Sequence, residues 1–130
     1  MRIGELAALT GTPPKTIRFY EDIRVLPAPA RTASQYRDYD QTAVSQLRFI
    51  RAAQALGLSL GEIREVISFR DRGETVCAHV ASLLQRRATE LDERIRELQR
   101  LRDELVRLAG RARRLDPRNC DPSLVCHVIP

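Results

Sequence analysis

Three cysteines are the residues with the clearest chemical potential in this sequence: Cys77, Cys120 and Cys126. Thiolates are soft ligands that suit zinc, cadmium, lead or mercury, and a histidine nitrogen would complete a tetrahedral zinc site. His127 adjoins Cys126, whereas His79 lies two residues after Cys77 and on a helix would point to another face. The candidate metal ligands are therefore Cys77, Cys120, Cys126 and His127. Zinc is the first choice of metal, with cadmium, lead and mercury as the others.

Other uses of these thiols are open. Cys77 as the reactive thiol of a redox or electrophile sensor is the main alternative, and a buried structural cysteine is another. An iron–sulfur cluster is disfavoured because it usually takes four cysteines and the chain has three. A cysteine hydrolase would need a histidine base in a cleft, and the sequence offers two histidines and no substrate domain. We therefore expect no enzymatic activity.

The composition describes a small basic chain. Of its 130 residues, 22 are Lys or Arg and 17 are Asp or Glu, which gives a net charge of +5. This balance favours an anionic partner such as nucleic acid. No run approaches the roughly 18 apolar residues of a membrane span, and the first residues lack the apolar stretch of a signal peptide. The expectation is a cytoplasmic protein with no membrane partner.

The elements that must position the reactive residues begin with two short helices. Apolar residues recur at helical spacing from Ile3 to Leu9, the Thr-Gly-Thr of residues 10–12 breaks the pattern, and Pro14 permits a second helix that continues to Ile23. This pattern is typical of a helix-turn-helix. The run over residues 26–39, rich in Pro and small residues, predicts a loop with one short hairpin, which would form a wing.

Two more helices are predicted before residue 70. An apolar stripe over residues 42–56 is ended by Gly57, and Ser59 with Glu62 forms a capping-box pattern in front of a further short helix.

A long helix is predicted over residues 75–114, with Thr75 as its N-cap and Cys77 in its first turn, where the helix dipole stabilises a thiolate. Its apolar side chains fall seven apart at Leu84, Leu91, Leu98 and Leu105. Four such heptads favour a coiled coil between chains, and packing of the helix on its own domain is the alternative. Pro117 stops the pattern, which leaves residues 115–130 as a short irregular tail.

The length of this helix constrains any shared metal site. At about 1.5 Å per residue the helix is roughly 55 to 60 Å long, with Cys77 at one end and Cys120 just beyond the other. Even at about 3.5 Å per extended residue, the tail cannot carry Cys120 back to its own Cys77. A metal bound by both thiols would therefore lie between two chains, and an antiparallel dimer would form such a site twice.

Several stretches carry a family resemblance: Ile3-Gly4-Glu5-Leu6-Ala7, the Lys-Thr-Ile-Arg-Phe-Tyr-Glu of residues 15–21, the Tyr-Arg-Asp-Tyr of residues 36–39, and the leucine-rich helix with its cysteine tail. The whole chain resembles the MerR family of bacterial transcription regulators, in particular its branch that senses divalent heavy metals. The resemblance implies a mostly α fold. A winged helix-turn-helix DNA-binding domain would span residues 1–70, an antiparallel coiled-coil dimerisation helix residues 75–114, and a metal-binding loop and tail residues 115–130.

The resemblance also implies a mechanism and partners. Such proteins are homodimers on double-stranded promoter DNA that activate transcription by distorting an over-long spacer when ligand binds, with RNA polymerase as a partner. DNA contact is assigned to Lys15, Arg18, Tyr20, Arg31, Tyr36 and Arg37. In a recognition helix, Arg18 would read bases, at about 1 to 3 kcal/mol of discrimination, while the other basic residues position the backbone. Core packing is the alternative for Tyr20.

The chain departs from the family pattern at three places. Arg24 stands where a glycine commonly follows the recognition helix, and Ser34-Gln35 replaces a glycine-rich turn in the wing. Ala112 stands near the place where copper(I)-sensing relatives carry a cysteine, and those relatives have a serine at the position of Cys77. We therefore expect a response to a soft dication and none to copper or silver.

Overall fold

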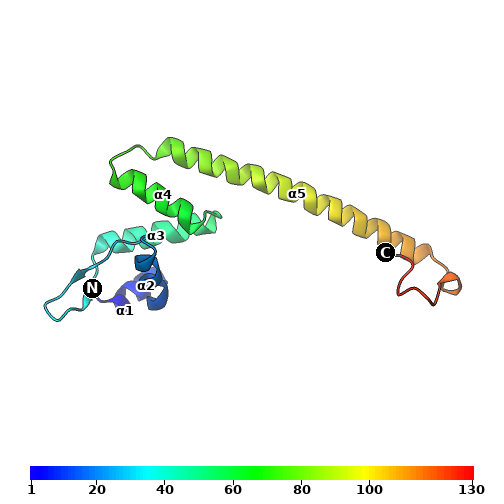
Figure 1. Cartoon of the computed structure of the whole chain (residues 1–130), viewed down its shortest axis with the longest axis horizontal. Coiled ribbons are helices and arrows are strands. Elements are labelled where there is room, and N and C mark those ends of the chain that lie inside the picture. The colour runs from blue at the N-terminus through cyan, green and yellow to red at the C-terminus, as the bar shows by residue number, and fades with distance from the viewer. The chain divides into compact units, whose positions relative to one another are not determined.

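The chain folds into helices and one small hairpin, described here by a computed structural model of residues 1–130. The elements in order are α1 (Ile3–Thr10), α2 (Pro14–Asp22), β1 (Ala30–Arg31), β2 (Arg37–Asp38), α3 (Gln41–Ala55), α4 (Leu60–Asp71), α5 (Cys77–Arg114) and a 3-10 turn, η1 (Pro117–Asn119) (Figure 1). No helix combines the length and the apolar character needed to cross a bilayer. The expected mostly α fold, with a helix-turn-helix followed by a long helix, is confirmed.

Two compact units make up the chain, residues 1–87 and residues 88–130. The division falls inside α5, whose first three turns belong to the first unit. The domain boundaries expected from the sequence, at residues 70, 75 and 115, partition the chain differently and stay a prediction.

The helix-turn-helix is built by α1 and α2. Gly11 ends α1 in the left-handed region, at φ +65°, where glycine is favoured. Arg51 of α3 donates a hydrogen bond to the carbonyl of Thr10 and so satisfies one of the free carbonyls at this helix end. Pro14 opens α2 in the first turn, and Leu6 and Ile17 bury their side chains completely between the two helices and α3.

The wing is a two-stranded antiparallel hairpin that pairs Ala30 with Asp38 and Arg31 with Arg37. Its turn is closed by Gln35, whose N–H donates to the Thr32 carbonyl at 2.9 Å and whose φ is +67°. Arg24, after α2, has φ +62°. Both positions at which the chain lacks the family's glycine therefore keep the left-handed backbone that glycine adopts most easily.

Capping side chains fix the ends of α3 and α4. Asp40 accepts hydrogen bonds from the N–H groups of Thr42 and Ala43, so α3 begins one residue before the expected 42–56 stripe. Ser59 and Glu62 form the expected capping box at the start of α4. Leu47, Ile50 and Ile63 from these helices are fully buried and join the core under α1 and α2.

The start of α5 differs from the expectation. The Val76 carbonyl accepts the first helical hydrogen bond, from the N–H of Val80 at 2.9 Å, so Val76 holds the cap position and Thr75 as N-cap is wrong by one residue. Val76 and Val80 pack on the core, and Leu83 is only 2% exposed. This packing, rather than a polar cap, sets where the helix begins.

The second unit contains the rest of α5 and the tail. Its apolar side chains are uncovered along the helix, at Leu91, Ile95, Leu98, Leu101 and Leu105. After α5, Asp116 caps η1 by accepting from the N–H of Arg118, and the remaining residues form turns with no regular element.

Candidate DNA-binding surface and thiol sites

Four arginines converge around one cavity of the first unit. The cavity has a volume of about 270 Å³ and is lined by Arg2, Ile3, Arg18, Arg31, Gln35, Tyr36 and Arg37, which we call the arginine pocket. These residues come from the start of α1, from α2 and from the wing, and none of them is acidic. The structure thus brings together four of the residues expected to contact DNA, Arg18, Arg31, Tyr36 and Arg37.

The expected recognition helix, α2, carries a second exposed basic side chain, Lys15, besides Arg18. Lys15 and Arg18 are both exposed and lie three residues apart on α2, which places them on one face of the helix. This face has the charge that a DNA backbone requires.

The two tyrosines of the expected DNA-contact set differ. Tyr36 is exposed. Tyr20 is only 6% exposed, and its hydroxyl donates to Oε1 of Gln54 at 3.1 Å. The structure therefore favours core packing for Tyr20, and we leave it out of the DNA-binding surface.

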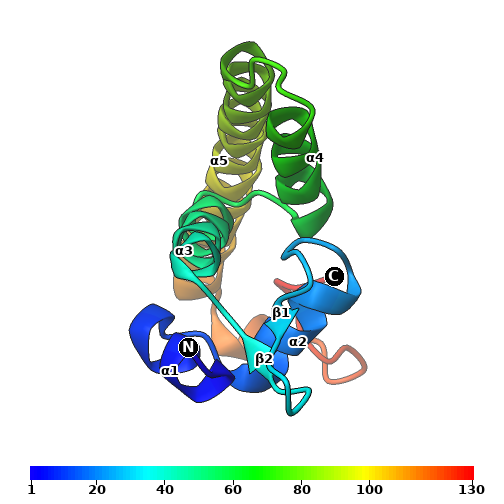
Figure 2. The same ribbon diagram turned by 90° about the vertical axis from the view of Figure 1, so that its left-hand side faces the viewer.

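Glu21 is a positioning residue that sequence reasoning missed. Its side chain is only 8% exposed and accepts hydrogen bonds from Nε of Arg37 at 3.1 Å and from the hydroxyl of Tyr39. These contacts join α2 to the wing, whose strands are drawn in front of α2 in Figure 2. Burial, followed by the hydrogen bond to Glu21, raises the pKa of Tyr39 well above its ordinary value. The one signal in the sequence was an acidic residue inside an otherwise basic motif.

Arg2 was missed as well. Its guanidinium carbon lies 4.1 Å from the centre of the Tyr36 ring, a cation–π contact between residues far apart in the chain. The Met1 carbonyl accepts a hydrogen bond from the N–H of Tyr39 at 2.8 Å and fixes the backbone beside Arg2 to the wing. No periodicity or motif in the sequence indicates a contact of this range.

The three cysteines are free and exposed, Cys77 as the first residue of α5 and the other two in the tail. Sγ of Cys126 accepts hydrogen bonds from the N–H groups of Val128 and Ile129, each at 3.4 Å. These bonds, the one from Ile129 first, hold the pKa of Cys126 below its usual value. In the same loop, Nε2 of His127 accepts from the N–H of Asp121.

One chain does not assemble the expected ligand set. Within residues 1–130 no group of three or more His, Cys, Asp or Glu side chains is placed to hold a metal ion. Cys77 belongs to the first unit, whereas Cys120, Cys126 and His127 belong to the second. The metal ligands therefore stay a prediction.

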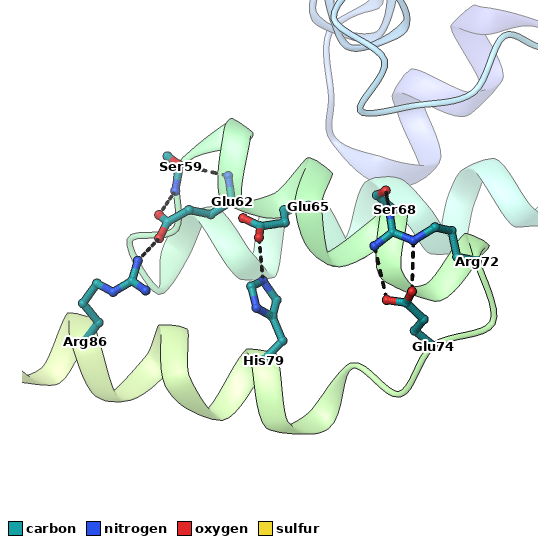
Figure 3. Close-up of polar contacts among 8 residues, drawn as sticks. All are labelled: Ser59, Glu62, Glu65, Ser68, Arg72, Glu74, His79 and Arg86. Carbon is teal, nitrogen blue, oxygen red and sulfur yellow. Dashed lines mark hydrogen bonds and ion pairs between the residues drawn. The ribbon is translucent and has the colours of Figure 1, made fainter.

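The other histidine faces α4. The His79 ring packs on Phe69, with 4.7 Å between ring centres, and Nε2 lies 3.6 Å from Oε1 of Glu65 (Figure 3). The imidazole is thus engaged with α4, in agreement with its expected orientation away from the side of Cys77.

The Glu62 side chain makes two sets of contacts where α4 packs on the first turns of α5. It completes the capping box with Ser59 and lies 3.9 Å from Nη1 of Arg86 (Figure 3). The same carboxylate also pairs with Arg87. The Ser59 N–H, and after it Arg87, keeps the pKa of Glu62 below its usual range. One carboxylate therefore fixes the start of α4 and ties the first turns of α5 to it.

The chain is similar to known regulators over nearly its whole length. The family profile "MerR HTH family regulatory protein" matches residues 1–69, and "MerR, DNA binding" matches residues 44–108. The transcriptional regulator HmrR of Rhizobium leguminosarum bv. viciae is 38% identical over 120 residues, which cover 92% of each chain. The mercuric resistance operon regulatory protein of Bacillus cereus is 36% identical over 85% of this chain and 83% of the relative.

A solved structure agrees in fold and sequence. The crystal structure of the regulator PbrR691 from Ralstonia metallidurans CH34 in complex with lead(II) superposes with a TM-score of 0.79 at 36% identity, covering 92% of this chain and 94% of that one. The profiles and the relatives agree with the helix-turn-helix, and the solved structure agrees with the fold described above over 92% of this chain. The chain therefore belongs to the MerR family of DNA-binding transcription regulators, which are not enzymes.

Proposed function

We propose that this protein is a metal-responsive transcription regulator that binds double-stranded promoter DNA as a homodimer and senses a soft divalent metal through cysteine thiolates. DNA is bound by the α2 face that carries Lys15 and Arg18 and by Arg31, Tyr36 and Arg37 of the wing. The observation that carries the metal assignment is the presence of three free, exposed cysteines, of which Cys126 has its sulfur oriented by two backbone N–H groups. Hydrogen bonds of this kind orient metal ligands in proteins.

The donor set fits a soft dication. Three thiolates suit zinc, cadmium, lead and mercury, and His127 supplies a nitrogen as a fourth ligand for zinc, our first choice. The lead(II) complex of PbrR691 and the mercuric resistance regulator of Bacillus cereus support this class of metal. A bound dication would offset the thiolate charge and cross-link the protein segments that carry the ligands.

The ligands would come from two chains. An unbroken helix of 38 residues separates Cys77 from the tail and is about 57 Å long at 1.5 Å per residue. The uncovered leucines of α5 supply an apolar face for a second copy, because an exposed stripe of this length is typical of a coiled coil. In an antiparallel pair, Cys77 of one chain would meet Cys120, Cys126 and His127 of the other at each end.

Metal binding would act on transcription through the DNA. Closing the two shared sites would change the placement of the two DNA-binding domains on the operator, distort an over-long promoter spacer and present it to RNA polymerase. Transcription from a purified promoter with and without zinc, with a spacer shortened to ordinary length as control, tests this step.

A mixed dimer tests the shared site. One chain carries Cys77→Ser, and the other carries Cys120→Ser together with Cys126→Ser. Only one end of this dimer keeps a complete set, so we expect one metal per dimer by elemental analysis after zinc loading, against two for the wild type. If a single chain contributed all three cysteines to each site, no complete site would remain, and two metals per mixed dimer would exclude these cysteines.

A further inference from the structure

The arginine pocket contains one cation that lies outside the residues expected from the sequence to contact DNA, Arg2. We propose that Arg2, held by the ring of Tyr36, binds a phosphate of the DNA backbone together with Arg18, Arg31 and Arg37. This inference rests on the proposed DNA-binding function and adds a residue and a ligand to it.

Charge is the first argument. Four guanidinium groups line a cavity of about 270 Å³ with no carboxylate among the lining residues. The buried Glu21 pairs with Arg37 alone and offsets one of the four charges. Like charges held this close repel one another, and an anion in the pocket relieves the repulsion. A phosphate group supplies the charge and the acceptor oxygens that several guanidinium groups can share.

The second argument is that three of the four arginines are held in place. Arg31 donates from Nη1 to the Gln35 carbonyl at 3.1 Å. Arg37 donates through Nε to Glu21, which leaves its two terminal nitrogens for an anion. Arg2 lies over the Tyr36 ring with 4.1 Å between Cζ and the ring centre, a contact that uses none of its N–H donors in a hydrogen bond.

The contact with Arg2 gives Tyr36 a positioning role in the arginine pocket. An aromatic face stabilises a guanidinium lying over it and restricts the rotamers of its long side chain. Less conformational entropy is then lost when the phosphate binds. Arg2 and Tyr36 should accordingly contribute to DNA binding as a coupled pair rather than as two independent contacts.

The source of the phosphate follows from the surroundings of the pocket. Wing residues and Arg18 of α2 line it, and Lys15 is exposed on the same face of α2 as Arg18, so the surface that is expected to follow a DNA backbone continues into the pocket. A phosphodiester of bound DNA would therefore reach Arg2 without a separate ligand.

Arg2→Ala is the direct test. The Arg2 side chain makes no capping hydrogen bond to α1, so its truncation leaves that helix end intact. We expect affinity for operator DNA to fall roughly tenfold on every sequence, and the salt slope to fall by about 0.9, the value for one phosphate contact. Arg2→Lys should keep the salt slope but only part of the affinity, because it keeps the charge and loses the contact of the guanidinium group with the Tyr36 ring.

The matched control is Arg96→Ala, which removes the same charge from α5. Arg96 lies roughly 160° around the helix from Leu98 at 100° per residue, on the face opposite the leucine stripe. A double-mutant cycle of Arg2→Ala and Tyr36→Ala should show that the two losses are not additive. The proposal would be overturned if the two losses of DNA-binding free energy were additive. It would also be overturned if Arg2→Ala bound operator DNA as tightly as Arg96→Ala.

Neutral methylphosphonates placed one at a time along the operator identify the phosphate. At one position in each half-site, the neutral methylphosphonate should weaken DNA binding by the wild type. At that position the wild type and Arg2→Ala should then have the same affinity for DNA. If the two proteins differ in affinity at every position, Arg2 does not bind a DNA phosphate. If inorganic phosphate at constant ionic strength then stabilises wild type but not Arg2→Ala against heat, the pocket binds the free anion instead, which also overturns the assignment to DNA. Failure of the wild type to bind any operator would contradict the proposed function itself.

Discussion

The carboxylate of Glu21 on α2 accepts a hydrogen bond from Nε of Arg37 on β2 at 3.1 Å. A largely buried acid thus fixes α2 to the wing and at the same time holds one of the arginines of the proposed DNA-binding surface.

Removing the charge of Glu21 should loosen this junction. Glu21→Gln weakens a charge-assisted bond to Arg37, so we expect the free energy of unfolding in urea to fall by about 1.5 to 3 kcal/mol. DNA affinity should fall too, because the wing loses its fixed position. Asp71→Asn is the control, since Asp71 pairs with Arg70 at 3.1 Å where both side chains are exposed and such pairs contribute about 0 to 1 kcal/mol. Equal losses for the two variants would contradict this role.

The raised pKa of Tyr39 predicts that the free energy of unfolding falls at high pH. Its pKa is raised in the folded protein, first by burial and then by the bond to Glu21, while the unfolded chain titrates near 10. Above about pH 10 the unfolded state therefore binds fewer protons than the folded state, and stability falls as the pH rises. Tyr39→Phe cannot ionise, so its unfolding free energy should decline less between about pH 9.5 and 11. Parallel declines for wild type and variant would count against the buried hydroxyl as the cause.

Local signals in the sequence predicted the elements well. The Thr-Gly-Thr break, Pro14, the capping box of Ser59 and Glu62, and the stop at Gly57 each act within a few residues, and each appears in the structure. The cap of α5 was misplaced because packing of Val76 and Val80 on the core, and not a polar side chain, sets the helix start.

Contacts between distant segments were not predictable from spacing. Arg2 meets Tyr36, and Glu21 meets Arg37 and Tyr39, only because the hairpin folds back beside α2. Tyr20 and Arg18 stand two residues apart in one motif, yet the helix turns one side chain into the core and the other outward. The sequence identified the basic motif, whereas the assignment of each side chain to core or surface needed the packed structure.

Arg24 offers a stabilising substitution. Its left-handed backbone costs an L-residue about 1 to 2 kcal/mol, and glycine avoids this cost while losing about 0.5 to 1 kcal/mol more conformational freedom on folding. Arg24→Gly should therefore raise the free energy of unfolding by about 0.5 to 1 kcal/mol in urea denaturation. Arg24→Ala is the matched control, because it removes the same side chain but keeps Cβ. A gain of the same size in the alanine variant would show that backbone strain is not the reason.

Leu98 tests the apolar face of α5. It is 59% exposed in the single chain, so Leu98→Ala should change the packing within one chain very little. In a dimer the same side chain would be buried, and its truncation should cost about 2 to 5 kcal/mol of association free energy. Sedimentation at low protein concentration should then show a monomer for the variant and a dimer for wild type and for Arg96→Ala. A variant as dimeric as the wild type would place the interface elsewhere.

Cys126 should react as a thiolate at lower pH than an ordinary cysteine. Hydrogen bonds from Ile129 and Val128 stabilise the charged sulfur and lower its pKa, and alkylation proceeds through the thiolate. In a protein that carries Cys77→Ser and Cys120→Ser, the pH midpoint of the rate of alkylation by iodoacetamide should lie below about pH 8.5, the pKa of a free thiol. In guanidinium chloride the midpoint should return to that value.

The lowered pKa of Cys126 also affects stability. Because the pKa in the folded protein is the lower one, the folded state binds fewer protons than the unfolded state between the two pKa values. These bonds therefore add stability as the pH rises through that window, and they lose it as the pH falls below the folded pKa. Identical midpoints for folded and unfolded protein would show that the backbone bonds do not act on the sulfur.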